Sequence, residues 1–160
     1  MRLLAKIGVV ACSLAVLGVA AAQNAPPTPE EQAKEMVVTR QGLFKLMELN
    51  MGPMAAMLRK RQPFDAAQIQ KSASRIEALA PMIPDLFKLD TRKVQVKTQA
   101  REGIWNSQAD FSAKADELAK AAAALKATAK GGDQGATMKA IGAVGKACGN
   151  CHDNFRDKTA

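Results

Sequence analysis

The chain has 160 residues, of which 48% are hydrophobic and 4% aromatic, and its formal net charge is +8. This length suits a single domain with one core. A basic balance often indicates nucleic-acid binding, but here the basic residues are scattered and aromatic residues are few, so we predict no nucleic-acid partner.

Residues 1–22 are predicted to form a secretory signal peptide. Arg2 and Lys6 supply a basic start, and the apolar stretch 7–19 is too short for a comfortable membrane span. The small residues 20–22 fit a cleavage site, so we expect cleavage after Ala22. Removal of the signal peptide lowers the formal net charge to about +6. The mature protein, 23–160, is then expected in the bacterial periplasm without a membrane anchor.

An alternative interpretation of this segment is a lipoprotein signal, because Val9-Val10-Ala11-Cys12 weakly resembles a lipoprotein processing box. Cys12 comes so early, however, that almost no hydrophobic region would precede it. Cleavage after Ala22 removes Cys12 and leaves two cysteines in the mature chain.

A first helix is predicted over about 29–60. Thr28 can cap it, Pro29 suits the first helical position, and Glu31 completes a capping box. Pro53 lies inside it and is expected to cause a kink. The apolar residues at helical spacing are Met36, Leu43, Phe44, Met47, Met51, Met54 and Met57.

Two more helices follow. Asp65 is expected to cap the second, which Pro81 and Pro84 end. Residues 84–103 show little periodicity and are predicted to form a surface loop with one short turn. The third helix is predicted from about 102 or 104 to 128, where Lys130-Gly131-Gly132 stops it. Its inward-facing residues are expected to be Ile104, Trp105, Phe111, Ala115, Leu118, Ala122 and Leu125.

The last helix is predicted to start near Asp133 and to run to about 158. It carries Cys148-Gly149-Asn150-Cys151-His152, the attachment pattern of c-type haem. The cysteines can each form a thioether to a haem vinyl group, and His152 can supply the axial nitrogen to iron. His152 is the only histidine in the chain, so no second imidazole can complete the coordination.

Two other interpretations of this motif compete with haem attachment. A Cys-x-x-Cys pair can be a redox pair or half of a zinc site. The chain has no second cysteine pair and no second histidine, so a four-ligand zinc site cannot be assembled. A redox pair would not require the adjacent histidine. We therefore predict one covalently attached haem c.

Four amphipathic helices without strand-like alternation predict an all-α fold, an antiparallel four-helix bundle with haem near the C-terminus. At this point the chain resembles the cytochrome c prime (cytochrome c') family. The resemblance is most specific at Cys148–Lys158 and extends to Arg40–Met47 with Asn50-Met51-Gly52, to Pro63-Phe64-Asp65 and to Ile104-Trp105. It implies haem c, a periplasmic location and a homodimer packed through the first two helices.

The resemblance also implies roles for single residues. Cys148 and Cys151 would bind the haem, His152 would ligate the iron, and Arg156 would sit near it on the proximal side. Arg40 and Gln41 match residues near the haem propionates, an arrangement that suits a guanidinium group. A solvated surface charge is the alternative for Arg40. We also place Trp105 among the haem-contacting residues.

The family has a branch with an open distal face that binds nitric oxide and carbon monoxide, and a low-spin branch in which a first-helix methionine ligates the iron for electron transfer. The last helix looks more like the second branch. By alignment, however, the distal position is Phe44, which has no lone pair for iron. Met47, one turn further along the helix, is the competing candidate for the iron ligand, and Met51 is a less favoured one. The alternative for both methionines is that they fill the core of the bundle and do not ligate iron.

The leading hypothesis is therefore a periplasmic haem c protein with a vacant sixth position that binds small gases, with Phe44 as an apolar gate. The alternative is a low-spin electron carrier with Met47 as ligand and a redox partner that the sequence does not indicate. An enzyme acting on an organic substrate has little support, because no general acid or base stands out besides His152 and scattered carboxylates.

Overall fold

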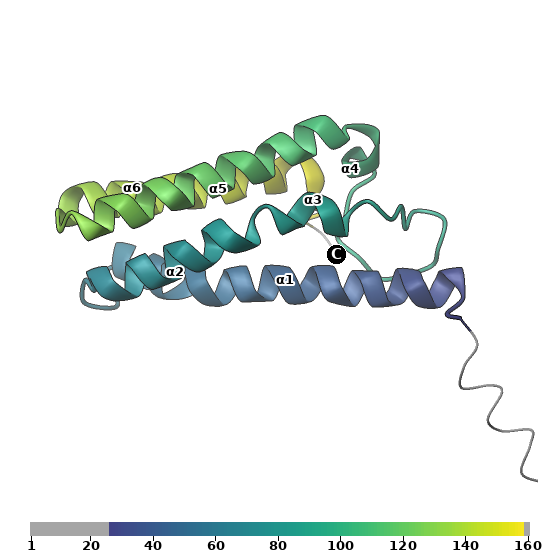
Figure 1. Cartoon of the computed structure of the whole chain (residues 1–160), viewed down its shortest axis with the longest axis horizontal. Coiled ribbons are helices and arrows are strands. Elements are labelled where there is room, and N and C mark those ends of the chain that lie inside the picture. The colour runs from purple at the N-terminus through teal and green to yellow at the C-terminus, as the bar shows by residue number, and fades with distance from the viewer. Residues whose placement is uncertain (1–25, 159–160) are drawn as a thin grey trace, which may run out of the picture.

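The computed structural model describes residues 26–158, which form four long helices and two short ones (Figure 1). The predicted signal peptide, its cleavage site and Cys12 lie outside the described residues. Within those residues, no helix is long and apolar enough to cross a membrane. The helices are α1 (Pro29–Leu58), α2 (Ala66–Leu79), α3 (Met82–Leu86), α4 (Gly103–Asn106), α5 (Gln108–Lys130) and α6 (Gln134–Phe155).

Local capping sets the helix starts, as predicted. The Thr28 hydroxyl accepts a hydrogen bond from the Glu31 amide at 3.3 Å, and the Glu31 carboxylate accepts one from the Thr28 amide at 2.7 Å. This capping box opens α1, which continues through Pro53. The Asp65 and Asp133 carboxylates cap α2 and α6 by accepting amide hydrogen bonds at 2.9 Å.

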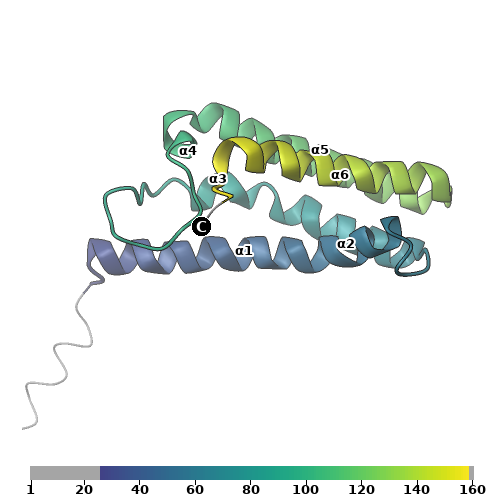
Figure 2. The same cartoon turned by 180° about the vertical axis from the view of Figure 1, so that it is seen from behind.

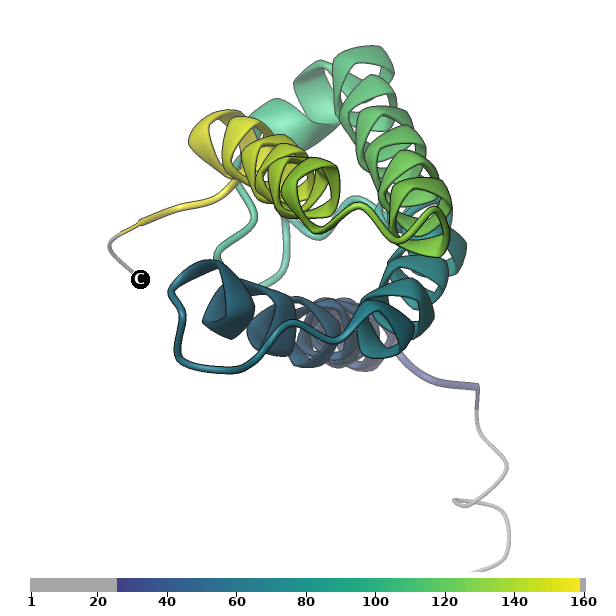
Figure 3. The same ribbon diagram turned by 90° about the vertical axis from the view of Figure 1, so that its left-hand side faces the viewer.

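The four long helices form the predicted bundle. Figures 1 and 2 show α1 and α2 in one layer and α5 and α6 in the other, and Figure 3 shows the four surrounding one core. The pairs α2–α5 and α5–α6 pack extensively, α1 packs mainly on α2, and α1 makes fewer contacts with α6. The buried core combines Leu, Ile and Met with small alanines of α5, which let its neighbours approach closely.

Two predicted helix boundaries are wrong. The helix predicted from about 102 to 128 is broken at Ser107, whose φ of −137° and ψ of 53° are not helical, so Trp105 lies in the separate α4. The last helix ends at Phe155 and not near 158. Arg156 is extended there and forms an isolated antiparallel bridge with Ala100.

The connection between α2 and α5 is more ordered than predicted. Pro84 lies inside α3, and the Phe87 and Thr91 side chains are buried. The Arg40 guanidinium of α1 donates hydrogen bonds to the carbonyls of Leu86 and Leu89 at 2.8 and 2.6 Å and to the Thr91 hydroxyl at 3.0 Å. The connection is thereby fastened to α1 and is not simply a surface loop.

Candidate haem site

The haem-attachment motif lies in the last two turns of α6. Cys148 and Cys151 are three residues apart and His152 is four residues from Cys148, so the helix brings their side chains to one face. All three are half-buried. The structure thus brings together the three residues predicted to attach the cofactor.

This face borders a cavity of about 1110 Å³. Typical small-molecule pockets measure about 300–1,000 Å³, so there is room for a large planar group such as a porphyrin. The cavity lies where α1 and α6 pack least closely, and α5 and residues 95–100 complete its wall. The position of the two thiols and the imidazole on a large, mainly apolar cavity fits haem c.

The same burial sets the protonation of these groups. Burial raises the pKa of the Cys148 thiol, and burial followed by the neighbouring Cys148 raises the pKa of Cys151 to about 11. Burial, and then the positive charge of Arg156, lower the pKa of His152. The imidazole is therefore neutral at neutral pH, the form that has a lone pair for a metal.

A continuous aromatic wall lines the cavity. The Phe87 ring contacts Phe44 with centroids 6.3 Å apart and Phe111 at 5.0 Å, and Phe111 contacts Phe155 at 5.1 Å. All four rings border the cavity, which they reach from α1, the connection, α5 and α6. The wall gives a flat ligand an apolar, shape-defined surface.

The α1 side of the cavity holds the candidate distal residues. Phe44 and Met47 both line it, one turn apart on α1, and Met51 follows. The Phe44 side chain is 36% exposed, whereas Met47 is 9% exposed and belongs to the hydrophobic core. Phe44 therefore stands at the border between cavity and solvent, and Met47 lies deeper.

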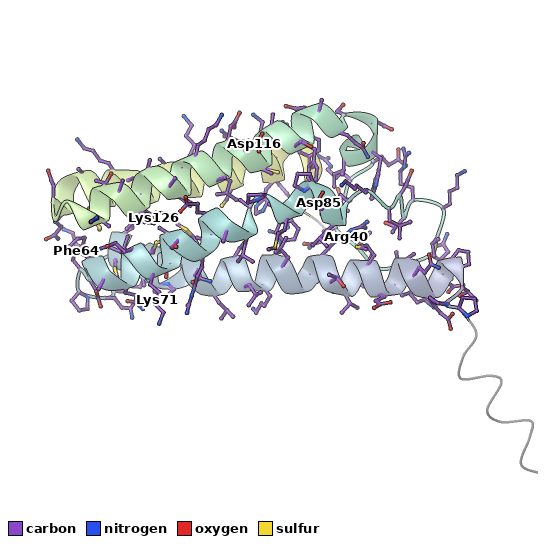
Figure 4. The ribbon with its side chains drawn as sticks, viewed as in Figure 1. Arg40, Phe64, Lys71, Asp85, Asp116 and Lys126 are labelled. Atoms are coloured by element: carbon purple, nitrogen blue, oxygen red, sulfur yellow. The ribbon has the colours of Figure 1, made fainter. Side chains whose placement is uncertain are left out.

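Arg40 and Gln41 also line the cavity, as expected of residues near a haem edge. Arg40 is not a solvated surface charge, since it is only 3% exposed, and burial lowers its pKa (Figure 4). Its guanidinium lies 4.4 Å from the Phe87 ring centroid, a cation–π contact. Arg40 thus holds the connection and the Phe87 ring against α1. Its role near the haem propionates stays a prediction.

Arg156 lies one turn after His152 and lines the cavity. Its Nε donates a hydrogen bond to the Gln99 side-chain oxygen at 2.9 Å. Backbone hydrogen bonds from Arg101 to Phe155 and from Asp157 to Gln99 fasten the connection to the end of α6. The geometry keeps a guanidinium group beside the predicted iron ligand.

Trp105 is placed outside the cavity wall. Its indole Nε1 donates a hydrogen bond to the Phe87 carbonyl at 3.0 Å, and its ring packs on Phe87 with centroids 6.2 Å apart. Trp105 therefore supports a cavity residue from behind and does not border the cavity itself.

Sequence reasoning missed two parts of the site. The aromatic wall needs Phe87, Phe111 and Phe155. Of these, only Phe111 is predicted from the sequence to face inward, and Phe87 lies in the segment predicted to be a surface loop. Residues 95–100 form a cavity wall although they show no periodic pattern. In the described part of the chain, no group of three or more His, Cys, Asp and Glu residues could hold a metal ion.

Comparisons with known proteins identify relatives of this chain. The sequence profile of the family described as Cytochrome C' matches residues 35–156. A cytochrome c' of Cereibacter sphaeroides is 39% identical over 128 residues, which cover 79% of this chain and 85% of that protein. A cytochrome c-554 of the same organism is 34% identical over 129 residues, covering 79% of this chain and 84% of that protein.

Solved structures are similar as well. Cytochrome c prime from Shewanella frigidimarina matches with a TM-score of 0.73 and 34% identity over 80% of this chain and 98% of its own. The nitric oxide complex of a variant of cytochrome c prime from Alcaligenes xylosoxidans matches with a TM-score of 0.69 and 30% identity over 79% and 97%. A cytochrome c' described as showing ligand-controlled dimer dissociation matches with a TM-score of 0.70 and 33% identity over 84% and 100%.

Proposed function

Because this chain belongs to the cytochrome c' family, we propose that it is a periplasmic haem c protein with five-coordinate iron that binds nitric oxide and carbon monoxide. Members of the family bind one covalent haem c and are haem proteins, not enzymes, as predicted from the sequence. Haem iron supplies reversible coordination of diatomic gases and exchange of one electron. Cys148 and Cys151 hold the group and His152 provides its protein ligand.

The observation that carries this proposal is Phe44 on the α1 side of the cavity. Its ring cannot coordinate iron, and it rests on Phe87 at the border with solvent. Together with the deeper Met47 it offers an apolar surface. Such a surface suits a neutral diatomic molecule better than a polar or anionic ligand, which would lose its hydration without a compensating partner. Phe44 then acts as a gate that swings aside.

The nitric oxide complex of a variant of a related cytochrome c prime supports the same proposal, because that variant, of the same fold and at 30% identity, accepts the gas. The predicted export signal supports the periplasmic location, where c-type haem is attached.

A low-spin electron carrier with Met47 as the sixth ligand is the second candidate. It is favoured by the position of Met47, which borders the same cavity as His152. Relatives named cytochrome c-554 are also nearly as similar as those named cytochrome c'. Against it stand the burial of Met47 in the core and the place of Phe44 nearer to solvent.

The near-infrared spectrum of the oxidised protein tests the two candidates against each other. Five-coordinate iron predicts no methionine-to-iron charge-transfer band, and Met47→Ala leaves the spectrum unchanged. A charge-transfer band that disappears in Met47→Ala contradicts the gas-binding proposal and establishes the electron carrier. Met54→Ala serves as the matched control for a general effect of losing a buried methionine of α1, because Met54 lies in the core and does not border the cavity.

We further propose that the protein is a homodimer packed through α1 and α2. The outward face of α1 exposes three large apolar residues, Val38, Leu46 and Leu49, which are 66%, 50% and 62% exposed in the single chain. Residues 38, 42, 46 and 49 follow one another at helical spacing, and Gly42 allows close approach. Leu46→Glu with Leu49→Glu is expected to give a monomer in analytical ultracentrifugation. An unchanged mass for that variant, or a monomeric unaltered protein, contradicts the homodimer.

A further inference from the structure

The connection that precedes α4 carries a net positive charge. Residues 88–101 contain five cations and one carboxylate, a net charge of +4, which is half of the formal +8 of the whole chain. The five cations are all exposed. They are Lys88, Arg92, Lys93, Lys97 and Arg101.

Ion pairs engage three of these five cations and leave two without a partner in the described part of the chain. Lys88, Arg92 and Arg101 form ion pairs with nearby aspartates. Lys93 and Lys97 have no ion-pair partner among residues 26–158. Exposed pairs are in any case weak and leave an outward positive potential. The segment therefore presents a basic surface to approaching molecules.

Part of this surface borders the haem cavity. Residues 95–100, including Lys97, form part of the cavity wall. Five further cations border the cavity, and the only acidic residue among the lining residues is Glu48. The five are Lys34, Arg40, Lys45, Lys114 and Arg156. Figures 1 and 2 show the connection projecting at one end of the bundle, away from the α5–α6 turn.

An aromatic contact joins this surface to the cavity. The half-buried Trp105 ring lies 5.7 Å from the guanidinium carbon of Arg92 on the connection. On its other side, the indole donates a hydrogen bond to the Phe87 carbonyl and packs on the Phe87 ring, which borders the cavity. Two packed aromatic rings thus lead from the basic surface to the haem site.

We propose that residues 88–101 form the docking surface for a one-electron carrier protein with an acidic face. The inference rests on the haem c of the proposed function, but not on its gas binding. In the complex, the reduced partner loses one electron and the haem iron gains it, with no change of covalent bonds or protons. Complementary charge steers the two proteins together and sets their orientation.

An acidic protein fits this surface better than an anionic membrane does. Among the large exposed hydrophobic residues of the described chain, Leu89 is the only one in this segment. A surface that inserts into a bilayer normally presents several bulky apolar side chains on one face. Charge without an apolar face suits a transient protein complex.

The test compares two charge-reversal variants of the holoprotein with the same change in net charge. Lys93→Glu with Lys97→Glu alters the proposed surface. Lys71→Glu with Lys139→Glu is the matched control, because both lysines are exposed in the first halves of α2 and α6, remote from the connection (Figures 1 and 4). Lys93→Gln with Lys97→Gln is expected to give an intermediate effect.

The probe is reduced flavodoxin, an acidic one-electron carrier, mixed with the ferric holoprotein in a stopped-flow instrument. At an ionic strength of about 10 mM, the surface variant is expected to react on the order of tenfold more slowly, and the control by less than about twofold. Raising the ionic strength to about 500 mM should remove the difference, because the Debye length then falls to a few ångströms.

Equal slowing of the two variants would mean that only net charge matters and would overturn the docking surface. Unchanged rates would overturn it as well. Sedimentation with phosphatidylglycerol vesicles is measured on the same samples. If only the surface variant loses vesicle binding and its reaction rate with flavodoxin is unaltered, the surface binds membranes and the proposal is contradicted. Carbon monoxide spectra of these samples test gas binding separately.

Discussion

Replacement of Phe44 by alanine is expected to speed the association of carbon monoxide with the reduced protein. The Phe44 side chain is 36% exposed, so roughly two-thirds of it is buried against its neighbours. Complete burial of a phenylalanine contributes about 1.5–3 kcal/mol, which leaves about 1–2 kcal/mol for this side chain. The contact of its ring with Phe87, at 6.3 Å between centroids, adds about 0.5–1.5 kcal/mol.

Moving the ring fully into solvent therefore costs about 1.5–3.5 kcal/mol. Since about 1.4 kcal/mol corresponds to a tenfold change, full opening would slow ligand entry by roughly tenfold to three-hundredfold. Partial rotation costs less, so we expect Phe44→Ala to raise the association rate on the order of tenfold to a hundredfold. Affinity should rise as well. The rate is measured by flash photolysis of the carbon monoxide complex.

Phe64→Ala is the matched control. Phe64 lies at the end of the bundle opposite the connection, where it is partly buried against the core (Figure 4). Its removal should lower stability and leave the association rate unchanged. An association rate in Phe44→Ala within about twofold of the unaltered protein would refute the gate, because no barrier of this size could then come from the ring.

Three further predictions concern stability and the sixth position. Arg40→Met leaves three oxygen atoms without their buried donor, so urea unfolding of the holoprotein should show a loss of about 3 kcal/mol; less than about 1 kcal/mol would contradict the anchoring role. Hydrogen bonds from Thr28 lower the pKa of Glu31 below its usual 4.5, so its stabilisation is present above that pH and is lost as the pH falls through the lowered pKa. Glu31→Gln should accordingly lose less thermal stability on acidification than the unaltered protein, and parallel losses would argue against the capping box as the cause. Met47→Leu keeps the core volume and should leave the absorption spectrum unchanged at a stability cost under about 1.5 kcal/mol, whereas a change of spin state would identify Met47 as a ligand.

The parts of the fold that local chemistry determines could be predicted from the sequence. The starts of α1, α2 and α6 follow from Thr28, Asp65 and Asp133, whose side chains cap amides within three residues. The haem motif is equally local, since Cys148, Cys151 and His152 need only one helix to share a face.

The parts that depend on distant contacts could not be predicted. The break at Ser107 separates α4 from α5, and the Trp105 indole in α4 is held by the carbonyl of Phe87, eighteen residues away. The end of α6 depends on the bridge between Arg156 and Ala100. The spacing of apolar residues around Trp105 and Arg156 does not indicate either contact.

In the site, too, distant contacts could not be predicted. The family resemblance indicates Phe44 as a distal residue, but its contact with Phe87 forms only because the connection packs against α1. Arg40 is a second example. Its guanidinium group is buried and donates hydrogen bonds to the carbonyls of Leu86 and Leu89, yet the sequence around it does not distinguish it from a solvated arginine.

The central claim is that the sixth coordination position is open. The most direct test is the visible absorption spectrum of the purified, dithionite-reduced protein before and after addition of carbon monoxide. An open sixth position predicts a broad, unsplit band that sharpens and shifts when the gas binds. Sharp, split bands that do not respond to carbon monoxide would show that a protein side chain already occupies the position, and would contradict the account in favour of Met47 ligation and electron transfer.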